Sequence, residues 1–232
     1  IGAYGYGGLQ GKVYVFQGSV GGFSGTAAGP DWYREGEGQQ GDRFGASVTG
    51  AGDVNGDGFS DLAVGAYAYN SNQGKVYVFH GSATGLPAQQ DSPAWAETGE
   101  AGNDFFGRFV AGLGDVNGDG YADLAVGAQG YNSLQGKVYV FAGSAAGITG
   151  TAADPAWSAE GETAGDSFGS VAGIGDVNGD GFADLVVGAR LYNNYRGKVY
   201  VFHGQPNGLP GWPFDPAWRE TGSESNIPDN YF

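Results

Sequence analysis

The stretch Gly74-Lys75-Val76-Tyr77-Val78-Phe79 decides how this sequence is interpreted, because the same run occurs four times. The other copies begin at Gly11, Gly136 and Gly197, so the repeat length is 61–63 residues. Three more signatures recur in step with it: Gly-Ala at Gly2, Gly65, Gly127 and Gly188; Phe-Gly at Phe44, Phe106 and Phe168; and tryptophan at Trp32, Trp95, Trp157 and Trp218. A period of this length indicates an array of similar structural units.

Each period predicts four short β-strands and almost no helix. In the second copy we expect strands near residues 46–51, 62–66, 75–79 and 94–97, separated by clusters of Gly, Asn, Pro and Ser. Both faces of the third strand are apolar, as stacking of sheets requires. Four antiparallel strands per period predict the blades of an all-β propeller. An array of β-sandwiches is the alternative, but a sandwich domain needs more strands per unit.

The repeat predicts that the 232 residues form a single, partial β-propeller domain. We expect an incomplete blade at residues 1–43 and blades at 44–105, 106–167 and 168–232. The first unit lacks its first strand and the Asp-rich loop that follows it. We therefore expect part of a larger propeller, or a chain completed by a neighbour, in preference to a closed ring of four blades.

Acidic residues dominate the charge of the chain, with 25 Asp and Glu against 10 Lys and Arg and a net charge of −15. Such a chain repels nucleic acid and anionic membranes, so we expect neither as a partner. No apolar run approaches the length of a membrane span, so we expect no membrane insertion. There is no cysteine, and the only histidines are His80 and His203. No constellation for nucleophilic catalysis is evident, and we expect no enzyme.

Nine of the aspartates lie in three copies of one loop, which reads Asp53-Val54-Asn55-Gly56-Asp57-Gly58-Phe59-Ser60-Asp61 in its first copy. Side-chain oxygens fall at positions 1, 3, 5 and 9, glycine at position 6, and position 7 would offer its backbone carbonyl. Hard oxygen ligands in a flexible loop suit Ca²⁺ better than Mg²⁺ or a transition metal. The sequence predicts three Ca²⁺ sites with the following ligands: Asp53, Asn55, Asp57, Phe59 and Asp61; Asp115, Asn117, Asp119, Tyr121 and Asp123; and Asp176, Asn178, Asp180, Phe182 and Asp184.

Two other interpretations of the loop are possible. Loops rich in Asp, Asn and Gly are often simple turns, but three copies of one ligand spacing in phase with the repeat favour a metal. An EF-hand needs an acidic ligand at position 12 and a flanking helix. Position 12 is Val64, Val126 or Val187, inside an apolar strand, so the EF-hand interpretation fails.

Taken together, Phe-Gly, Asp-Val-Asn-Gly-Asp-Gly, Val-Gly-Ala and Gly-Lys-Val-Tyr-Val-Phe resemble the FG-GAP repeats of integrin α-subunit propellers, and in style those of bacterial secreted FG-GAP proteins. The resemblance covers essentially the whole chain. It implies Ca²⁺ between the first and second strands of each blade, a propeller that usually has seven blades, and an extracellular or cell-surface location. The third Phe-Gly lies eight residues before its Asp instead of nine, which predicts a bulge adjustment in that first strand.

Binding is the function that the remaining loops suggest. In a four-stranded blade the 2–3 and 4–1 loops share one end and the calcium loops lie at the other. The 2–3 loops carry Tyr69, Tyr131 and Tyr192 among Asn and Ser, residue types that recognise protein or glycan ligands. We expect a non-catalytic binding, adhesion or assembly scaffold with structural calcium in each blade.

Two alternatives are a glycan-binding lectin propeller and an accessory propeller of a larger secreted enzyme. The incomplete blade edges also predict self-association of the chain. The four repeated tryptophans are expected to pack between blades in preference to forming a platform for sugars.

Overall fold

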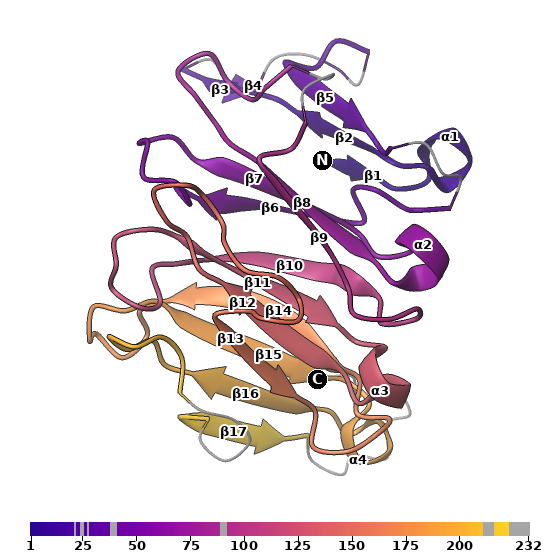
Figure 1. Ribbon diagram of the computed structural model, residues 1–232, viewed down its shortest axis with the longest axis vertical. Helices are drawn as coiled ribbons and strands as arrows, with labels where there is room; N and C mark the ends of the chain where they lie inside the picture. The colour runs from indigo at the N-terminus through magenta and orange to yellow at the C-terminus, as the bar shows by residue number, and fades with distance from the viewer. Residues whose placement is uncertain are drawn as a thin grey trace.

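The computed structural model describes residues 1–20, 22–23, 26, 28–37, 41–88, 92–210 and 216–222. Antiparallel sheets are stacked side by side in chain order, from the indigo N-terminal sheet to the yellow C-terminal sheet in Figure 1. Three sheets have four strands each and the first has three. The prediction of an all-β fold built from four-stranded propeller blades is confirmed.

The strands follow the predicted meander. The first sheet consists of β1 (Gly2–Ala3), β2 (Lys12–Val15) and β5 (Trp32–Glu35), with a small unpredicted hairpin of β3 (Gly18–Ser19) and β4 (Gly22–Phe23) before β5. The complete sheets consist of β6 (Ser47–Gly52), β7 (Asp61–Ala66), β8 (Lys75–Phe79) and β9 (Trp95–Thr98); β10 (Phe106–Gly114), β11 (Asp123–Ala128), β12 (Lys137–Phe141) and β13 (Trp157–Glu160); and β14 (Phe168–Gly175), β15 (Asp184–Ala189), β16 (Lys198–Phe202) and β17 (Trp218–Thr221).

The register between the second and third strands is the same in every complete sheet. Val64 pairs with Tyr77, and the equivalent pairs recur in the next two sheets. Val76, Tyr77, Val78 and Phe79 are all at most 2% exposed, although their side chains alternate between the two faces of the sheet. Both faces are buried because a neighbouring blade covers each of them, as the apolar pattern of this strand predicts.

A four-residue turn that begins at a tyrosine links the second and third strands of each sheet. The turns are α1 (Tyr6–Leu9), α2 (Tyr69–Asn72), α3 (Tyr131–Leu134) and α4 (Tyr192–Tyr195). Their centres are left-handed: in α2, φ is +47° at Asn70 and +60° at Ser71. Asn and Gly tolerate this conformation better than other residues, which accounts for their presence in these turns. All four turns lie along one edge of the stack, on the right in Figure 1. We refer to this edge as the α-turn end; the Asp-rich loops lie at the other end of the same strands.

The first strands β10 and β14 differ by one residue, as the short spacing after Phe168 predicts. In β10, Gly107 and Arg108 separate the paired residues Phe106 and Phe109. In β14 only one residue separates the paired Phe168 and Ser170. The deletion is therefore absorbed by a smaller irregularity directly after Phe-Gly, and the following residues keep the same register.

The repeated tryptophans pack between blades, as predicted. Each of the first three lies against the phenylalanine that ends the third strand of the following blade, with centroid distances of 5.6 Å for Trp32–Phe79, 5.0 Å for Trp95–Phe141 and 5.1 Å for Trp157–Phe202. Trp218, in the last sheet, is 52% exposed. The tryptophan therefore acts as a connector from one blade to the next.

The boundaries of the units at residues 43, 105 and 167 stay predictions. The next Phe-Gly position, at Phe232, lies outside the described residues. Within the described ranges, no helix has the length and apolar character needed to cross a membrane.

Candidate metal centre

The first aspartate of each Asp-rich loop holds the loop closed. Oδ1 of Asp53 accepts the backbone N–H groups of Gly56 at 2.7 Å and Asp57 at 3.0 Å, and Oδ2 accepts that of Gly58 at 2.8 Å. The same three bonds recur at Asp115 and Asp176. Gly56 has φ +73°, a conformation that a residue without Cβ adopts without strain. Position 1 therefore shapes the turn as well as being a predicted ligand.

Positions 3 and 5 are joined side chain to side chain. Asn55 Nδ2 donates to Asp57 Oδ2 at 2.9 Å, and the other loops repeat this bond at 3.0 and 2.7 Å. The hydrogen bond from Asn55 lowers the pKa of Asp57, and the backbone N–H of Phe59 lowers it further. In the third loop the N–H of Gly181 is the main cause that lowers the pKa of Asp176. These carboxylates are ionised at neutral pH, as cation ligands must be.

The last aspartate of each loop is buried and accepts two backbone N–H groups. Asp61 is 2% exposed, and Asp123 and Asp184 are 0% exposed. Asp61 accepts from Val54 in its own loop at 2.8 Å and from Gly81, just after β8, at 2.8 Å. The other two loops repeat both bonds. Position 9 therefore ties the loop to the end of the third strand.

The second partner of this aspartate was not predicted from the sequence. The sequence feature that could have indicated it is a glycine two residues after each of the last three Gly-Lys-Val-Tyr-Val-Phe runs, at Gly81, Gly143 and Gly204. The glycine is required by close packing: a Cβ at Gly81 would lie 2.3 Å from the carbonyl oxygen of Ser60.

Burial makes the ionised form of these last aspartates unfavourable. Desolvation raises the pKa of Asp61, and it raises the pKa of Asp123 to about 6. The charges of Asp119 and Asp115 raise the pKa of Asp123 further, against the two N–H bonds that lower it. A cation in the loop would relieve this repulsion.

Each of the first two loops also accepts backbone hydrogen bonds from the following blade. The carbonyls of Asp53 and Val54 accept N–H groups from Ala122 at 3.0 Å and Ser144 at 3.1 Å. Val54 is 0% exposed as a result, whereas its counterpart in the third loop, Val177, is 56% exposed. The loops are therefore parts of the junctions between blades, so that anything that stiffens a loop also stiffens a junction.

The donor chemistry of the loops fits a hard cation. Every predicted ligand atom is an oxygen, and an ionised carboxylate has about four lone-pair sites, so Asp53 keeps one beyond its three N–H partners. Among the residues that the structure describes, however, no three acidic or histidine side chains converge on a common point. The structure places each predicted ligand set in one loop; its role in binding a metal stays a prediction.

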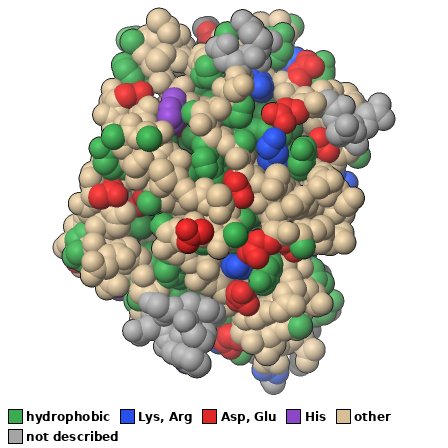
Figure 2. All heavy atoms as spheres, viewed as in Figure 1, with side chains coloured by type: hydrophobic (Ala, Val, Ile, Leu, Met, Phe, Trp, Pro, Cys, Tyr) green, Lys and Arg blue, Asp and Glu red, His purple; other side chains and the backbone are tan. Residues whose placement is uncertain are grey.

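A lysine ammonium group lies over the ring of each predicted ligand-binding tyrosine. The Nζ atoms of Lys75, Lys137 and Lys198 lie 5.0, 4.8 and 4.4 Å from the ring centroids of Tyr69, Tyr131 and Tyr192. The same lysines form ion pairs with the preceding blade, at 2.9 Å to Glu37, 2.7 Å to Glu100 and 2.5 Å to Glu162. Figure 2 shows basic side chains beside acidic ones along the middle of the molecule. These contacts account for the repeated tyrosines structurally, and their role in ligand binding stays a prediction.

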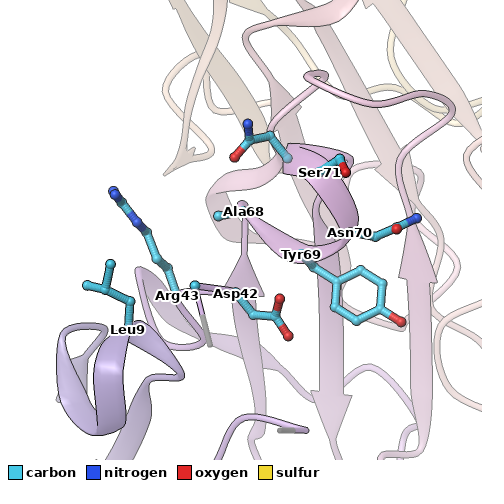
Figure 3. Close-up of a pocket in the computed structure, with 9 residues that line it drawn as sticks. Leu9, Asp42, Arg43, Ala68, Tyr69, Asn70 and Ser71 are labelled. Atoms are coloured by element: carbon cyan, nitrogen blue, oxygen red, sulfur yellow. The ribbon is translucent and has the colours of Figure 1, made fainter. Parts of the chain in front are cut away.

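One of the tyrosines also borders a hollow at the α-turn end. Tyr69 lines a cavity of about 550 Å³ together with Leu9, Asp42, Arg43 and Asn70. In Figure 3 the Asp42 carboxyl and the Tyr69 ring lie on one side, and the Arg43 side chain extends away from both. Residues of both the first and the second blade therefore line this cavity.

Comparisons with known proteins agree with this architecture. The FG-GAP repeat family matches residues 44–79, 106–141 and 168–202. Integrin alpha-4 of Xenopus laevis is 34% identical over 65% of this chain and 15% of its own length, and integrin alpha-IIb of Mus musculus is 37% identical over 70% and 16%. Integrin alpha-PS5 of Drosophila melanogaster is 45% identical over 40% and 10%. The chain thus spans at most 16% of the length of these relatives. Its three matched repeats and its blades make it an FG-GAP repeat protein with an integrin-like β-propeller architecture.

Proposed function

We propose that this chain is a calcium-stabilised, non-catalytic binding module of the extracellular or cell-surface kind, which recognises a protein ligand. The observation that carries the proposal is the threefold recurrence of one loop, with the same hydrogen bonds to its first, third, fifth and ninth residues. The similarity to integrin α-subunits supports an adhesion-type role outside the cell. The net charge of −15 argues against nucleic acid and anionic membranes as partners.

Calcium would be held in each loop by the side chains of positions 1, 3, 5 and 9 and the carbonyl of position 7, from Asp53 to Asp61 in the first copy. Its charge would offset that of the buried aspartate and its neighbours, and would stiffen the loop on which the following blade rests. At millimolar calcium and affinities usual for extracellular modules, each site would add about 0.4–1.4 kcal/mol to the free energy of unfolding. Three such sites acting together would make the stack depend on calcium.

Thermal unfolding in EGTA and in millimolar calcium tests the proposal, with the bound metal counted by calorimetry. We expect a lower melting temperature in EGTA, and weaker calcium binding when Asp57, Asp119 and Asp180 are all replaced by Asn. The matched control is Asp154→Asn, which removes one carboxylate from an exposed position outside the loops. An identical melting curve with and without calcium would refute the structural role of the ion.

The exposed end of the stack supports self-association as a second candidate function. Trp218 and Val177 are 52% and 56% exposed, whereas their counterparts Trp157 and Val116 contact the following blade. A second copy could cover these side chains in the same way. Light scattering over a range of concentrations tests this: we expect a dimer or larger species that Trp218→Ala weakens, and a strict monomer would refute it.

Direct binding assays distinguish a protein ligand from a glycan ligand. A glycan array run beside protein-binding assays would favour the lectin alternative if sugars bound at repeated sites, and the protein-binding proposal if they did not. The alternative of an accessory propeller in a larger secreted enzyme predicts binding to that enzyme's substrate.

A further inference from the structure

The repeats of this chain differ from one another at two positions that meet at the α-turn end. The residue after each Gly-Ala is Tyr4, Tyr67, Gln129 or Arg190, and the residue before each Phe-Gly is Arg43, Phe105 or Ser167. The motifs beside them are constant. In the last blade the two positions contact each other, where Arg190 Nε donates to Ser167 Oγ at 3.3 Å. The two positions therefore meet in more than one blade, but their chemistry differs from blade to blade.

Three side chains at these positions, Arg43, Tyr67 and Phe105, form one cluster with Arg108, which follows the second Phe-Gly. The guanidinium carbons of Arg43 and Arg108 lie 5.2 and 5.3 Å from the centroid of the Tyr67 ring, and the Phe105 ring meets it edge to face at 6.1 Å. Arg43 Nη1 donates a hydrogen bond to the Tyr67 hydroxyl. We call Arg43, Tyr67, Phe105 and Arg108 the Tyr67 patch; all four side chains are partly exposed.

A local irregularity in β10 places Arg108 in this patch. Gly107 and Arg108 interrupt the pairing of β10 with β11, whereas in β14 only Gly169 lies between the paired residues. Ser170, which matches Phe109 in register, accepts a hydrogen bond from Gln129 Nε2 at 2.9 Å. Bulges re-aim side chains at functional sites, and here the longer bulge turns a cation onto an aromatic ring.

The Tyr67 patch carries two positive charges, although the chain as a whole has an excess of acidic residues. All four lysines form ion pairs with glutamates. Within the described ranges, neither Arg43 nor Arg108 has an acidic side chain at ion-pair distance, and in Figure 3 Arg43 extends away from Asp42. Two partly desolvated guanidinium groups that share one ring attract an anion at short range.

We propose that the Tyr67 patch binds a carboxylate side chain, Asp or Glu, of a protein ligand. The guanidinium forks match the two oxygens of a carboxylate, and the rings of Tyr67 and Phe105 offer apolar surface to its methylene groups. A polyanion is a poorer occupant, because the net charge of −15 repels it at longer range than the patch attracts it. This inference rests on the proposed role as a protein-binding module and names the chemistry of the partner.

A nuclear magnetic resonance titration of the ¹⁵N-labelled chain in calcium tests it, with N-acetyl-Gly-Glu-Gly-amide as the probe and the Gln peptide as its control. We expect the Glu peptide alone to shift the Nε–H signals of Arg43 and Arg108 saturably. Arg43→Gln or Arg108→Gln should weaken binding by about tenfold, the effect of one lost charge-assisted hydrogen bond. The matched control Arg219→Gln removes the same charge at an exposed site in β17 and should bind as the unmodified chain does.

Three results would overturn the proposal: equal shifts with both peptides, unchanged affinity in folded Arg108→Gln protein, or saturable binding of glucuronate or inorganic phosphate but not of the Glu peptide. Circular dichroism establishes that each variant is folded. The outcome is separable from that of the calcium test, because the patch lies at the opposite end of the strands from the Asp-rich loops. If the chain responds to calcium but does not bind the Glu peptide, the proposal for the Tyr67 patch fails and the calcium proposal stands. If it binds the peptide but does not respond to calcium, the calcium proposal fails instead.

Discussion

The indole ring of Trp95 lies 5.0 Å, centroid to centroid, from the ring of Phe141 in the following blade. Phe141 is 0% exposed and also lies 6.2 Å from Phe106, the first residue of β10. One side chain from the outermost strand of a blade therefore reaches an aromatic cluster in its neighbour. Stability of the stack should depend on these junctions more than on any single sheet, because a sheet alone leaves both faces of its third strand exposed.

Replacing Trp95 with Ala should lower the free energy of unfolding by about 2–4 kcal/mol, because it removes an aromatic contact and leaves a void between two blades. Urea unfolding followed by circular dichroism measures the change. Trp218→Ala is the matched control within the same protein, since Trp218 is 52% exposed. We expect the control to change stability of the monomer by less than about 0.5 kcal/mol. Equal effects of the two substitutions would contradict the role of the junction.

Gly127 tests how closely the inner strands of two blades approach. A Cβ at this position would lie 1.9 Å from the carbonyl oxygen of Gly169 in the next blade, so Gly127→Ala must push the two strands apart. We expect a loss of about 3 kcal/mol or more, or failure to fold. Gly50→Ala is the control, because nothing lies within 4 Å of a Cβ built there. Comparable yields and melting temperatures for the two variants would show that the strands can separate at little cost.

The sequence predicts what repeats locally and misses contacts that depend on how strands pair or on how blades stack. Strand order and the Val64–Tyr77 register follow from the spacing of apolar residues along the chain. The bond from Gly143 to Asp123 spans 20 residues and depends on how β11 pairs with β12. The ion pair of Lys137 with Glu100 crosses a junction, and no local pattern encodes it.

The candidate functional residues likewise include some that the sequence could predict and some that it could not. The loop from Asp53 to Asp61 could be named from its oxygen spacing, because its ligands are close in sequence. The Tyr67 patch could not, because Arg43, Tyr67 and Arg108 belong to three separate stretches of chain and meet only through stacking and a bulge. The left-handed turns were missed for a different reason: four residues are too few to show a period.

The raised pKa of Asp123 predicts a pH dependence in metal-free protein. Burial raises the pKa of this carboxyl to about 6, above its ordinary value of 3.8, so the folded chain binds the proton more tightly than the unfolded chain does. The contribution of Asp123 therefore becomes more stabilising as pH falls from 7 toward 4, by on the order of 2–3 kcal/mol. Urea unfolding in EGTA at a series of pH values measures this trend.

Asp123→Asn should remove that part of the trend, because an amide does not titrate. Carbon-13 signals of the Asp123 carboxyl give a second readout that does not require the variant to be stable. In millimolar calcium the dependence should weaken or reverse, because bound calcium favours the ionised carboxylate. A carboxyl that titrates near pH 4 in metal-free protein would contradict the prediction.

Leu134 and Asn72 occupy the same place in consecutive turns, with φ of +64° and +61°. A left-handed conformation costs a residue such as leucine roughly 1–2 kcal/mol, and asparagine adopts it more readily. Leu134→Asn should therefore raise the free energy of unfolding by about 0.5–1 kcal/mol, since Leu134 is 42% exposed and little apolar burial is lost. Asn72→Leu is the reciprocal variant and should lower it by a similar amount. Thermal unfolding measures both, and changes of the same sign would show that backbone strain in these turns is not what distinguishes the two residues.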